Sequence, residues 1–252
     1  MSSNTILFAL LGYPLSHSFS QGHFRDKFEK EGLTDHDYIL LDLPQIDDLP
    51  KQLDKLPNLR GFNVTIPYKE KVIAFLSELD PSAERIGAVN VVKMENGIWK
   101  GYNSDYYGFQ KSLEEFLPKK LVKKAIVLGS GGASKAAIVA LEDLGFEVLK
   151  VSRNPQAKTH TISYDKLKSM ENWADEYPLI VNATPLGTYP NLNSCPDLYY
   201  TKLSNKNLLY DMVYNPSETL FMKRGLELGA KVKNGLDMLH YQAEKAWEIW
   251  QA

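Results

Sequence analysis

The chain has 252 residues, of which 44% are hydrophobic, so it is long enough to bury the core of one large α/β domain or of two domains of ordinary size. Its 29 Lys and Arg residues nearly balance its 31 Asp and Glu residues, which argues against a protein that reads nucleic acid or binds an anionic membrane surface. The single cysteine, Cys195, excludes an intramolecular disulfide and a zinc site built on several thiolates, and it favours a cytoplasmic location.

The first apolar run, Ile6–Leu11, is far shorter than the roughly 20 residues that span a bilayer. No basic segment precedes it, so we expect neither a membrane segment nor a signal peptide, and we interpret the run as a buried strand. The five histidines form no i, i+4 pair beside a carboxylate, so we expect no metal site.

Strand-like and helix-like segments alternate through the first hundred residues. In chain order we expect a strand at Ile6–Gly12, a helix at Phe19–Glu31, a strand at Tyr38–Leu43, a helix at Gln45–Leu56, a strand at Gly61–Ile66 and a helix at Lys69–Leu79. This order predicts a parallel βαβαβ unit. A hairpin is expected over Ala88–Tyr102, because Asn96-Gly97 readily adopts the positive φ angles of a tight turn.

A helix expected at Ser104–Phe116 leads into a second alternating region. There we expect strands at Ala125–Leu128, Glu147–Val151, Leu179–Asn182 and Leu208–Met212, and helices at Ser134–Leu144 and Glu218–Leu228. This is the doubly wound pattern of a Rossmann-like nucleotide-binding domain. The aromatic-rich last helix, Leu236–Trp250, is expected to pack back on the first half.

The predicted fold class is therefore α/β, with two α/β domains. Residues 1–104, joined by residues 236–252, form the first domain, with a mainly parallel sheet, and residues 105–235 form the Rossmann-like domain.

A glycine-rich segment, Gly129-Ser130-Gly131-Gly132-Ala133-Ser134, lies between an expected strand and an expected helix, which is the context of a dinucleotide-binding turn. Glycine allows a tight turn and lets backbone N–H groups approach a pyrophosphate, and the positive end of the helix dipole favours the anion. Ser134 stands where the usual fingerprint has its third glycine. A glycine-rich turn without a ligand is the alternative.

The second strand of this unit ends in Val151-Ser152-Arg153-Asn154, without the acidic residue that would bind the ribose of NAD. Ser152, Arg153 and Asn154 offer a hydroxyl, a guanidinium and an amide to the 2′-phosphate of NADP, and Lys158 can assist. The pattern predicts NADP as the cofactor. An exposed surface charge is the alternative interpretation of Arg153.

Polar residues also follow the expected strands of the first half. Ser16 and Ser18 lie near a helix N-terminus, a place suited to a carboxylate, although a serine there is often only an N-cap. The segment Asn63–Lys69 ends the third strand and starts a helix, so Asn63, Thr65 and Lys69 are expected to face one crevice. Lys69 is expected in the first turn of the helix, where the dipole disfavours a positive charge, and a solvent-exposed lysine is the alternative.

Two further polar residues flank the hairpin. Asn90 follows Gly87-Ala88-Val89, and Asp105 lies in the first turn of the next helix, where a carboxylate is favoured as a cap. Capping explains one aspartate, but it does not explain the conjunction of Asp105 with Asn90 and the lysine motif, which indicates a site.

In this order, the motifs resemble those of the shikimate dehydrogenase family, from Gly12 to Gln242. The matching segments are the serine pair, Asn63-Val64-Thr65-Ile66-Pro67-Tyr68-Lys69, Gly87-Ala88-Val89-Asn90, Asn103-Ser104-Asp105-Tyr106-Tyr107-Gly108, the glycine turn, Asn182-Ala183-Thr184-Pro185-Leu186-Gly187, Tyr210-Asp211-Met212-Val213-Tyr214-Asn215-Pro216, and Gly235 with Gln242.

The resemblance implies an oxidoreductase that interconverts 3-dehydroshikimate and shikimate with NADP, a step of chorismate and aromatic amino-acid biosynthesis. It implies that Lys69 and Asp105 are catalytic, that Ser16 and Ser18 bind the substrate carboxylate, and that Tyr214 closes on the carboxylate side. The residues implied to hold the ring hydroxyls are Asn63, Thr65, Asn90, Asp105 and Gln242. Those implied to line the cofactor are Asn182, Ala183 and Thr184, with Met212, Gly235 and Met238 near the nicotinamide.

The chain departs from the family pattern at four places. Ser104 and Val91 stand where the family often has threonine, Gln21 where proline is frequent, and Ser130 where alanine is usual. Lys69 and Asp105 are unaffected, so the departures concern affinity and fine substrate choice rather than the type of reaction.

Two alternatives stay open: a broader quinate/shikimate dehydrogenase, and a non-catalytic NADP-binding module. We expect a small-molecule substrate, no nucleic-acid or membrane partner, and a monomer or homodimer.

Overall fold

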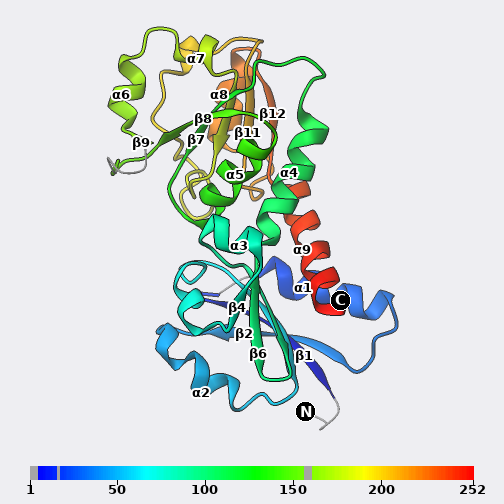
Figure 1. The fold of residues 1–252 in the computed structure, drawn as a ribbon. Helices are drawn as coiled ribbons and strands as arrows, with labels where there is room; N and C mark the ends of the chain where they lie inside the picture. The colour runs from blue at the N-terminus through cyan, green and yellow to red at the C-terminus, as the bar shows by residue number, and fades with distance from the viewer. Residues whose placement is uncertain (1–4, 16–17, 156–160) are drawn as a thin grey trace. The chain divides into compact units, whose positions relative to one another are not determined.

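The computed structural model describes residues 5–15, 18–155 and 161–252, and the chain divides into two compact units (Figure 1). Residues 1–104 and 243–252 form the first unit, and residues 105–242 form the second unit. Over the described residues, each unit contains one six-stranded sheet.

The sheet of the first unit has the strand order β2-β1-β3-β5-β6-β4. Its strands are β1 (Ile6–Gly12), β2 (His36–Asp42), β3 (Leu59–Val64), β4 (Glu78–Leu79), β5 (Val91–Glu95) and β6 (Ile98–Tyr102). Strand β1 pairs in parallel with β2 and β3, as the predicted βαβαβ unit requires, and the β5–β6 hairpin continues the sheet in antiparallel. Asn96 and Gly97 have φ angles of 51° and 79°, so the predicted tight turn is confirmed.

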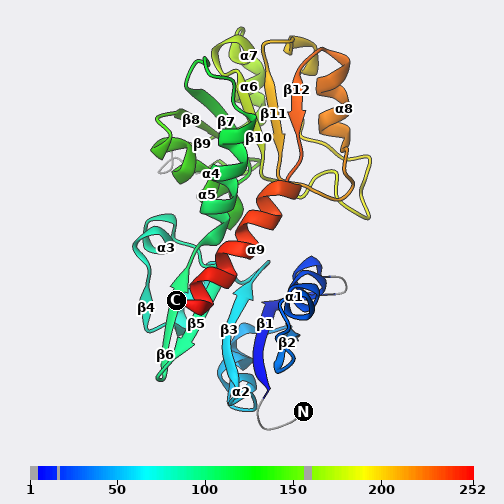
Figure 2. The same cartoon turned by 90° about the vertical axis from the view of Figure 1, so that its right-hand side faces the viewer.

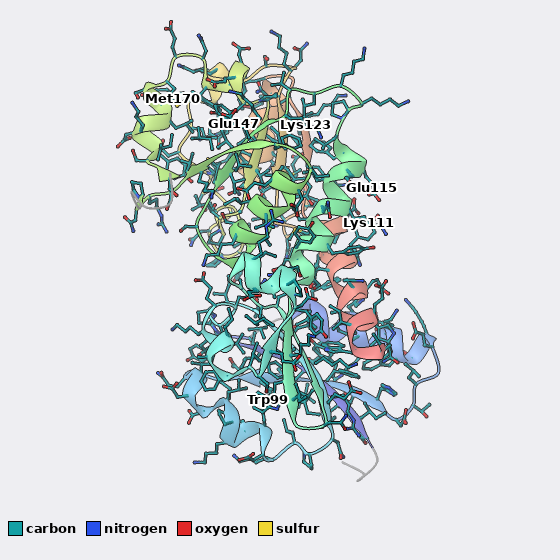
Figure 3. All side chains as sticks on the ribbon, in the orientation of Figure 1. Trp99, Lys111, Glu115, Lys123, Glu147 and Met170 are labelled. Atoms are coloured by element: carbon teal, nitrogen blue, oxygen red, sulfur yellow. The ribbon has the colours of Figure 1, made fainter. Side chains whose placement is uncertain are left out.

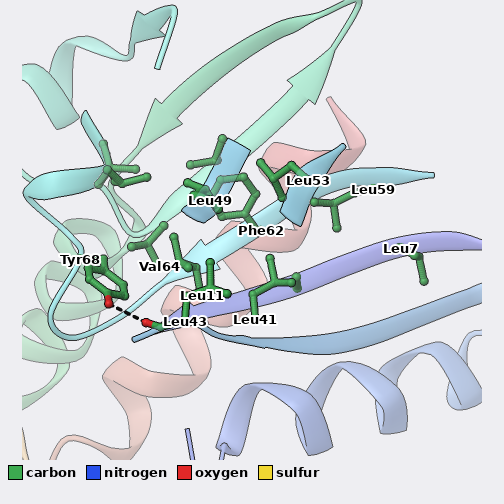
Figure 4. Packing of buried hydrophobic residues seen from close by; sticks show 14 of the residues in the cluster. Leu7, Leu11, Leu41, Leu43, Leu49, Leu53, Leu59, Phe62, Val64 and Tyr68 are labelled. Carbon is green, nitrogen blue, oxygen red and sulfur yellow. Dashed lines mark hydrogen bonds between the residues drawn. The ribbon is translucent and has the colours of Figure 1, made fainter. Parts of the chain in front are cut away.

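Both faces of this sheet are covered, because successive residues of β1 point into different cores. Leu7 and Leu11 belong to a core shared with β3 and with the short helix α2 (Leu49–Leu53), which follows the 3-10 helix Ile46–Asp48 (Figure 4). Phe8 belongs to the opposite core, which contains Phe24 and Phe28 of helix α1 (Phe19–Lys30). The alternation holds β1 at the centre of the unit.

The end of the last helix, α9 (Leu236–Gln251), completes the opposite core of the first unit. Trp250 stacks on Phe8 with 4.5 Å between the ring centroids, and its Nε1 donates to the Val92 carbonyl at 3.0 Å. A Cβ on Gly61 would overlap the Trp250 indole, so only glycine fits at that position of β3. The predicted packing of the C-terminal helix on the first half is thus confirmed.

The helix predicted at Lys69–Leu79 is wrong. The structure has a 3-10 helix at Lys71–Phe75, strand β4 paired in parallel with β6, and helix α3 (Pro81–Ile86), whose N-cap Asp80 accepts from the Ser82 N–H. Backbone bonds from Ser77 to Trp99 and from Asp80 to Gly101 hold the segment against β6. Pairing with the sheet thus overrides the apolar periodicity that suggested a long helix.

The sheet of the second unit is fully parallel, with the order β12-β11-β10-β7-β8-β9 (Figure 2). Its strands are β7 (Lys124–Leu128), β8 (Glu147–Val151), β9 (Thr161–Ile162), β10 (Leu179–Asn182), β11 (Leu208–Asp211) and β12 (Lys231–Lys233). The helices are α4 (Ser104–Phe116), α5 (Gly132–Asp143), α6 (Tyr164–Ser169), α7 (Trp173–Glu176) and α8 (Leu220–Glu227), with a 3-10 turn at Tyr200–Lys202 and the first part of α9. The predicted doubly wound pattern is confirmed. The strand order switches between β7 and β10: β8 and β9 follow on one side of β7, and β10, β11 and β12 follow on the other.

Helices α4 and α9 pack together within the second unit. Tyr241 of α9 donates its hydroxyl to Glu115 at 2.7 Å and lies under the Lys111 ammonium, which is 4.3 Å from the ring centroid; both partners are labelled in Figure 3. A Cβ on Gly108 would lie 2.6 Å from the Met238 carbonyl, so glycine permits this close approach.

Of the helices in the described part of the chain, none combines the length and the apolar character that a bilayer-spanning segment needs. The same residues contain no group of three or more His, Cys, Asp or Glu side chains arranged to hold a metal ion.

Candidate functional site

The polar residues of the first unit gather where β1 and β3 end. Three backbone hydrogen bonds bring their segments together: Thr65 N–H donates to the Leu11 carbonyl at 2.8 Å, Val64 N–H to the Asn90 carbonyl at 2.9 Å, and Val89 N–H to the Lys69 carbonyl at 2.7 Å. Asn63, Thr65, Lys69 and Asn90 therefore lie on neighbouring segments.

The side chain of Asn63 is held in one orientation. The Tyr38 hydroxyl donates to its Oδ1 at 2.7 Å, and its Nδ2 donates to the Asn90 carbonyl at 3.2 Å. Burial raises the pKa of Tyr38 well above its usual value, although a hydrogen bond with Ser20 opposes the rise. The hydroxyl therefore stays protonated and can donate. Because Tyr38 determines which end of the Asn63 amide is the acceptor, the Nδ2 group is left as the donor end.

Sequence reasoning missed Tyr38 and Ser20. The usable signal for Tyr38 is a hydroxyl-bearing aromatic residue inside an apolar strand, since a buried tyrosine usually finds a hydrogen-bond partner. Ser20 lies in the first turn of α1, two residues after Ser18.

Asn90 holds the start of helix α4. Its Oδ1 accepts from the Ser104 N–H at 2.6 Å, and its Nδ2 donates to the Ser104 Oγ at 3.0 Å. Asn103 also anchors this corner by donating to the Ala88 carbonyl at 2.8 Å. Asp105 follows Ser104 directly in the chain and is only 6% exposed. The amide of Asn90 thus sets where the chain enters the turn that carries Asp105.

Lys69 is half-buried and lies in a turn before the 3-10 helix Lys71–Phe75. It is therefore not in the first turn of an α-helix, and the helix-dipole argument made from the sequence does not apply to it. Its position is set by the bond between its carbonyl and Val89.

Ser18 is the N-cap of α1, and its side chain accepts from the Gln21 N–H at 3.3 Å. The capping role, which was the alternative interpretation, is therefore present in the structure. Ser16 lies outside the described residues.

In the second unit, the glycine turn joins β7 to α5. Gly129 has a φ of 122°, and a Cβ there would lie 2.9 Å from the Ala183 carbonyl oxygen, so this position requires glycine. Ser134, fully buried at the third glycine position, donates its hydroxyl to the Gly129 carbonyl at 2.8 Å and so closes the turn.

The space at the start of α5 fits a dinucleotide phosphate. Gly131 is the N-cap residue, and a Cβ there would meet nothing within 4 Å. Within the described residues, no side chain caps this N-terminus, so the first-turn N–H groups keep the donor capacity that a pyrophosphate needs.

The residues expected around the 2′-phosphate follow β8. Arg153 and Asn154 are exposed, and Ser152, which is nearly buried, accepts from the Asn154 N–H at 3.4 Å. Burial raises the pKa of Tyr164 to about 12, and the nearby charge of Arg153 opposes this rise. Lys158 lies outside the described residues.

The segments expected near the nicotinamide meet at the ends of β10 and β11. Met212 N–H donates to the Asn182 carbonyl at 2.9 Å, and Gly235 N–H donates to the Val213 carbonyl at 3.2 Å. A Cβ on Gly235 would overlap the Met212 carbonyl, so Gly235 must stay glycine. Met238 belongs to the core against which Met212 packs. Together with Ala183 beside Gly129, these contacts gather the predicted cofactor residues along one edge of the sheet.

Three residues assigned to the substrate from sequence, Asp105, Tyr214 and Gln242, lie in the second unit rather than with Asn63 and Lys69. Tyr214 follows β11 and is 39% exposed, and burial of its hydroxyl raises its pKa. Gln242 lies on α9, where its Nε2 donates to the Leu239 carbonyl at 3.0 Å.

A buried carboxylate, Asp211, lies at the end of β11. It accepts from Asn182 Nδ2 at 2.9 Å, from the Val213 N–H at 3.0 Å and from the Thr219 hydroxyl at 2.6 Å. Burial raises its pKa to about 6, although the three donors oppose the rise. Sequence reasoning included Asp211 in a motif but gave it no role.

Comparison with known proteins agrees with this arrangement. Residues 10–92 match the model of the shikimate dehydrogenase substrate binding domain. A shikimate dehydrogenase (NADP(+)) of Caldanaerobacter subterraneus is 36% identical over 99% of this chain and 93% of its own length. The shikimate dehydrogenase structure from Aquifex aeolicus has a TM-score of 0.86 at 31% identity, covering 99% of this chain and 94% of that one.

A further solved structure, the shikimate 5-dehydrogenase of Thermus thermophilus in complex with NADP(H) and shikimate, is 34% identical with a TM-score of 0.84. The match covers 98% of this chain and 93% of the Thermus thermophilus chain. Identity above 30% over nearly the whole length, with the motifs placed as described, shows that the chain belongs to the shikimate dehydrogenase family.

Proposed function

We propose that this chain is an NADP-dependent oxidoreductase that reversibly reduces 3-dehydroshikimate to shikimate, in the pathway that leads to chorismate and the aromatic amino acids. The observation that carries the proposal is the cluster of Asn63, Thr65, Lys69 and Asn90 at the carboxyl ends of β1 and β3, because these side chains suit a polyhydroxylated ring. Relatives whose length this chain covers to 93% carry this activity in their names.

The domain roles follow from where these groups lie. Residues 1–104 with 236–252 form the substrate-binding domain in this proposal, and residues 105–235 form the NADP-binding domain. Ser16 and Ser18 bind the carboxylate, with Tyr214 closing on that side. The ring hydroxyls are held by Asn63, Thr65, Asn90, Asp105 and Gln242.

The cofactor residues are assigned along the edge of the second sheet. NADP supplies or accepts a hydride at its nicotinamide ring. The backbone of Gly129 to Ala133 holds the pyrophosphate, Ser152 to Asn154 with Lys158 hold the 2′-phosphate, and the nicotinamide half lies along Asn182, Ala183, Thr184, Met212, Gly235 and Met238. The open space at Gly131 supports this placement.

Two residues act on the C3 oxygen of the substrate in this proposal. Lys69 donates a proton to the C3 oxygen of the substrate during reduction and accepts it during oxidation, and Asp105 hydrogen-bonds the same hydroxyl. The anchoring of Lys69 to Val89, and of Ser104 to Asn90, supports a fixed position for both groups.

The test is NADPH formation, followed by absorbance, when the purified protein receives shikimate and NADP⁺. We expect turnover, and we expect Lys69→Ala to lower kcat roughly 10²–10⁴-fold. The matched control is Lys71→Ala, which removes an exposed lysine two residues away, at the start of the 3-10 helix. Near-full turnover by Lys69→Ala would sink the assignment of Lys69, and no turnover by the wild type would sink the proposed function.

Cofactor choice has its own test. Arg153→Ala should raise the KM for NADPH far more than the KM for NADH, because only NADPH carries the 2′-phosphate. Equal effects on the two cofactors contradict the role of Arg153.

A broader quinate/shikimate dehydrogenase is separated by assays with shikimate and quinate, each with NADP⁺ and NAD⁺. A non-catalytic NADP-binding module would bind NADPH in the same assays without turnover.

The partners of the proposed enzyme are small molecules, and its location is cytoplasmic. Light scattering coupled to size-exclusion chromatography decides between monomer and homodimer.

A further inference from the structure

Asp211 is an ionisable group that the proposed reaction does not use. It is completely buried, and its hydrogen-bond partners are all donors: an amide, a backbone N–H and a hydroxyl. Among the described residues, no lysine, arginine or histidine forms an ion pair with it. An ionised carboxylate can accept all three bonds at once, whereas a neutral side chain of the same shape cannot.

The three bonds join parts of the second unit that are distant in sequence. Asn182 ends β10, Val213 follows β11, and Thr219 is the N-cap of α8, where its hydroxyl accepts from the Met222 N–H at 3.3 Å. One carboxylate therefore fixes two strand ends and the start of a helix relative to one another.

Further hydrogen bonds connect the partners of Asp211 to the residues assigned to the nicotinamide. Asn182 Oδ1 accepts from the Thr184 N–H at 3.1 Å and from the Thr184 hydroxyl at 2.6 Å, so holding Asn182 also holds Thr184. The Val213 carbonyl accepts from Gly235, and the Asn182 carbonyl accepts from Met212. Each of these segments thus lies one or two hydrogen bonds from Asp211.

The glycine turn and the end of β8 have a separate support. Gly129 N–H donates to the Val151 carbonyl at 2.9 Å, and Ser134 closes the turn. These two hydrogen bonds do not pass through Asp211, and the turn in addition packs against Ala183.

We propose that Asp211 is a positioning residue for the nicotinamide half of the NADP site, acting through Asn182, Val213 and Thr219, while the phosphate half has hydrogen bonds of its own. This inference rests on the proposed function, because it assumes that NADP binds along this edge of the sheet.

The test compares two ligands by equilibrium titration on the full chain. NADPH carries both halves of the cofactor, and adenosine 2′,5′-bisphosphate carries the adenosine with its 2′-phosphate and one 5′-phosphate but no nicotinamide half. Asp211→Ala removes all three bonds and should weaken NADPH binding about tenfold, the equivalent of about 1.4 kcal/mol, while the bisphosphate affinity stays within about twofold.

Asp211→Asn is the conservative variant and keeps the experiment decisive if Asp211→Ala does not fold. Its Oδ1 can retain the bonds to Asn182 and Val213, but its Nδ2 faces the Thr219 hydroxyl with a donor instead of an acceptor. We expect a smaller loss of NADPH affinity than in Asp211→Ala, again with unchanged bisphosphate affinity.

The matched control is Asn207→Ala at the opposite end of β11. Asn207 is also buried, and it accepts from the Ser204 N–H and donates to the Ala174 carbonyl. It should lower the melting temperature without changing the ratio of the two dissociation constants. If the Asp211 variants also leave that ratio unchanged, Asp211 is only a stabilising residue and the inference is overturned.

The proposed function is tested by the wild-type chain, not by the Asp211 variants. A wild-type chain that binds neither NADPH nor the bisphosphate has no NADP site, and both proposals fall. A wild-type chain that binds both ligands but does not oxidise shikimate contradicts only the proposed reaction, and the ratio still decides the role of Asp211.

Discussion

At the scale of single residues, Tyr38 of strand β2 is bonded to Asn63, one of the residues proposed to bind the substrate. Tyr38→Phe removes the donor and leaves a buried amide oxygen without that partner, which costs about 1–3 kcal/mol of stability. The Asn63 amide then keeps only its bond to the Asn90 carbonyl and is held less firmly, so we expect a higher KM for shikimate with little change in the KM for NADP⁺. Denaturant unfolding and steady-state kinetics measure the two effects.

Tyr200→Phe is the control for this prediction. It removes a buried hydroxyl that donates to the Pro196 carbonyl in the second unit. It should lower stability by a similar amount and leave the KM for shikimate unchanged. An identical KM for shikimate in wild type and Tyr38→Phe would contradict the positioning role of Tyr38.

The raised pKa of Asp211 makes a prediction about pH. Burial raises it from the ordinary value of 3.8 to about 6, so between these values the folded chain binds more protons than the unfolded chain. Stability contributed by this group therefore increases as pH falls from about 6 towards 4, and it is lost as pH rises through about 6.

Urea unfolding of wild type and Asp211→Asn at several pH values checks this. Since other groups titrate equally in both proteins, the difference in unfolding free energy isolates Asp211. That difference should move in favour of the wild type as the pH is lowered from 7 to 4.5. A difference that does not vary with pH is incompatible with a raised pKa.

Residue chemistry could be predicted from the sequence only where a motif carries it. Asn63 lies near the end of β3, Lys69 follows β3 and Asn90 directly precedes β5, and each belongs to a recognisable motif. Tyr38 and Asp211 could not be found in this way, because their partners lie 25 and 29 residues away in the chain and are chosen by strand order. Local propensity contains no information about that order.

At the scale of elements, two glycines of the turn between β7 and α5 have different roles: Gly129 is required by the fold, and Gly131 by the proposed cofactor site. Gly129→Ala places a Cβ 2.9 Å from the Ala183 carbonyl at a φ of 122°, which should cost on the order of 1–3 kcal/mol and disturb the turn. Gly131→Ala meets nothing within 4 Å and has an ordinary φ of −83°, so the fold should tolerate it.

We expect Gly129→Ala to lower both the melting temperature and NADPH affinity. Gly131→Ala should leave the melting temperature near the wild-type value but weaken NADPH binding about tenfold, since its methyl group occupies the space assigned to the pyrophosphate. Thermal unfolding with and without NADPH distinguishes the two. Unchanged NADPH affinity in Gly131→Ala would remove the turn from the cofactor site.

Elements with strong local signals could be predicted well, and short ones could not. Strands β1, β8 and β10 match their predicted ranges; β1 and β10 are buried apolar runs with clear ends, whereas β8 is partly buried and ends at the buried Val151. The segment around Lys69–Leu79 failed because strand β4 consists of two residues that pair with β6. Asp80-Pro81, an N-cap followed by proline, was the overlooked signal that a separate helix begins there.

At the scale of the whole molecule, the first unit is built from two stretches that lie at opposite ends of the sequence, residues 1–104 and 243–252. The later stretch supplies Ala243, Ala246 and Trp250 to the core that contains Phe8 and Phe24. The unit therefore cannot complete this core until residues 243–252 have been synthesised, and contacts of such long sequence separation slow folding.

Trp250→Ala tests how far the first unit depends on this stretch. Removing a buried indole that stacks on Phe8 and bonds the Val92 carbonyl should cost about 3–5 kcal/mol, because a cavity opens beside β1. Hydrogen exchange should speed up most in the amides of β1, β2 and β3, with a smaller change in β10 and β11. Trp247→Ala, a half-buried neighbour on the same helix, should show a weaker version of the pattern. Equal acceleration in both sheets would mean that Trp250 stabilises the chain as a whole and not the first unit in particular.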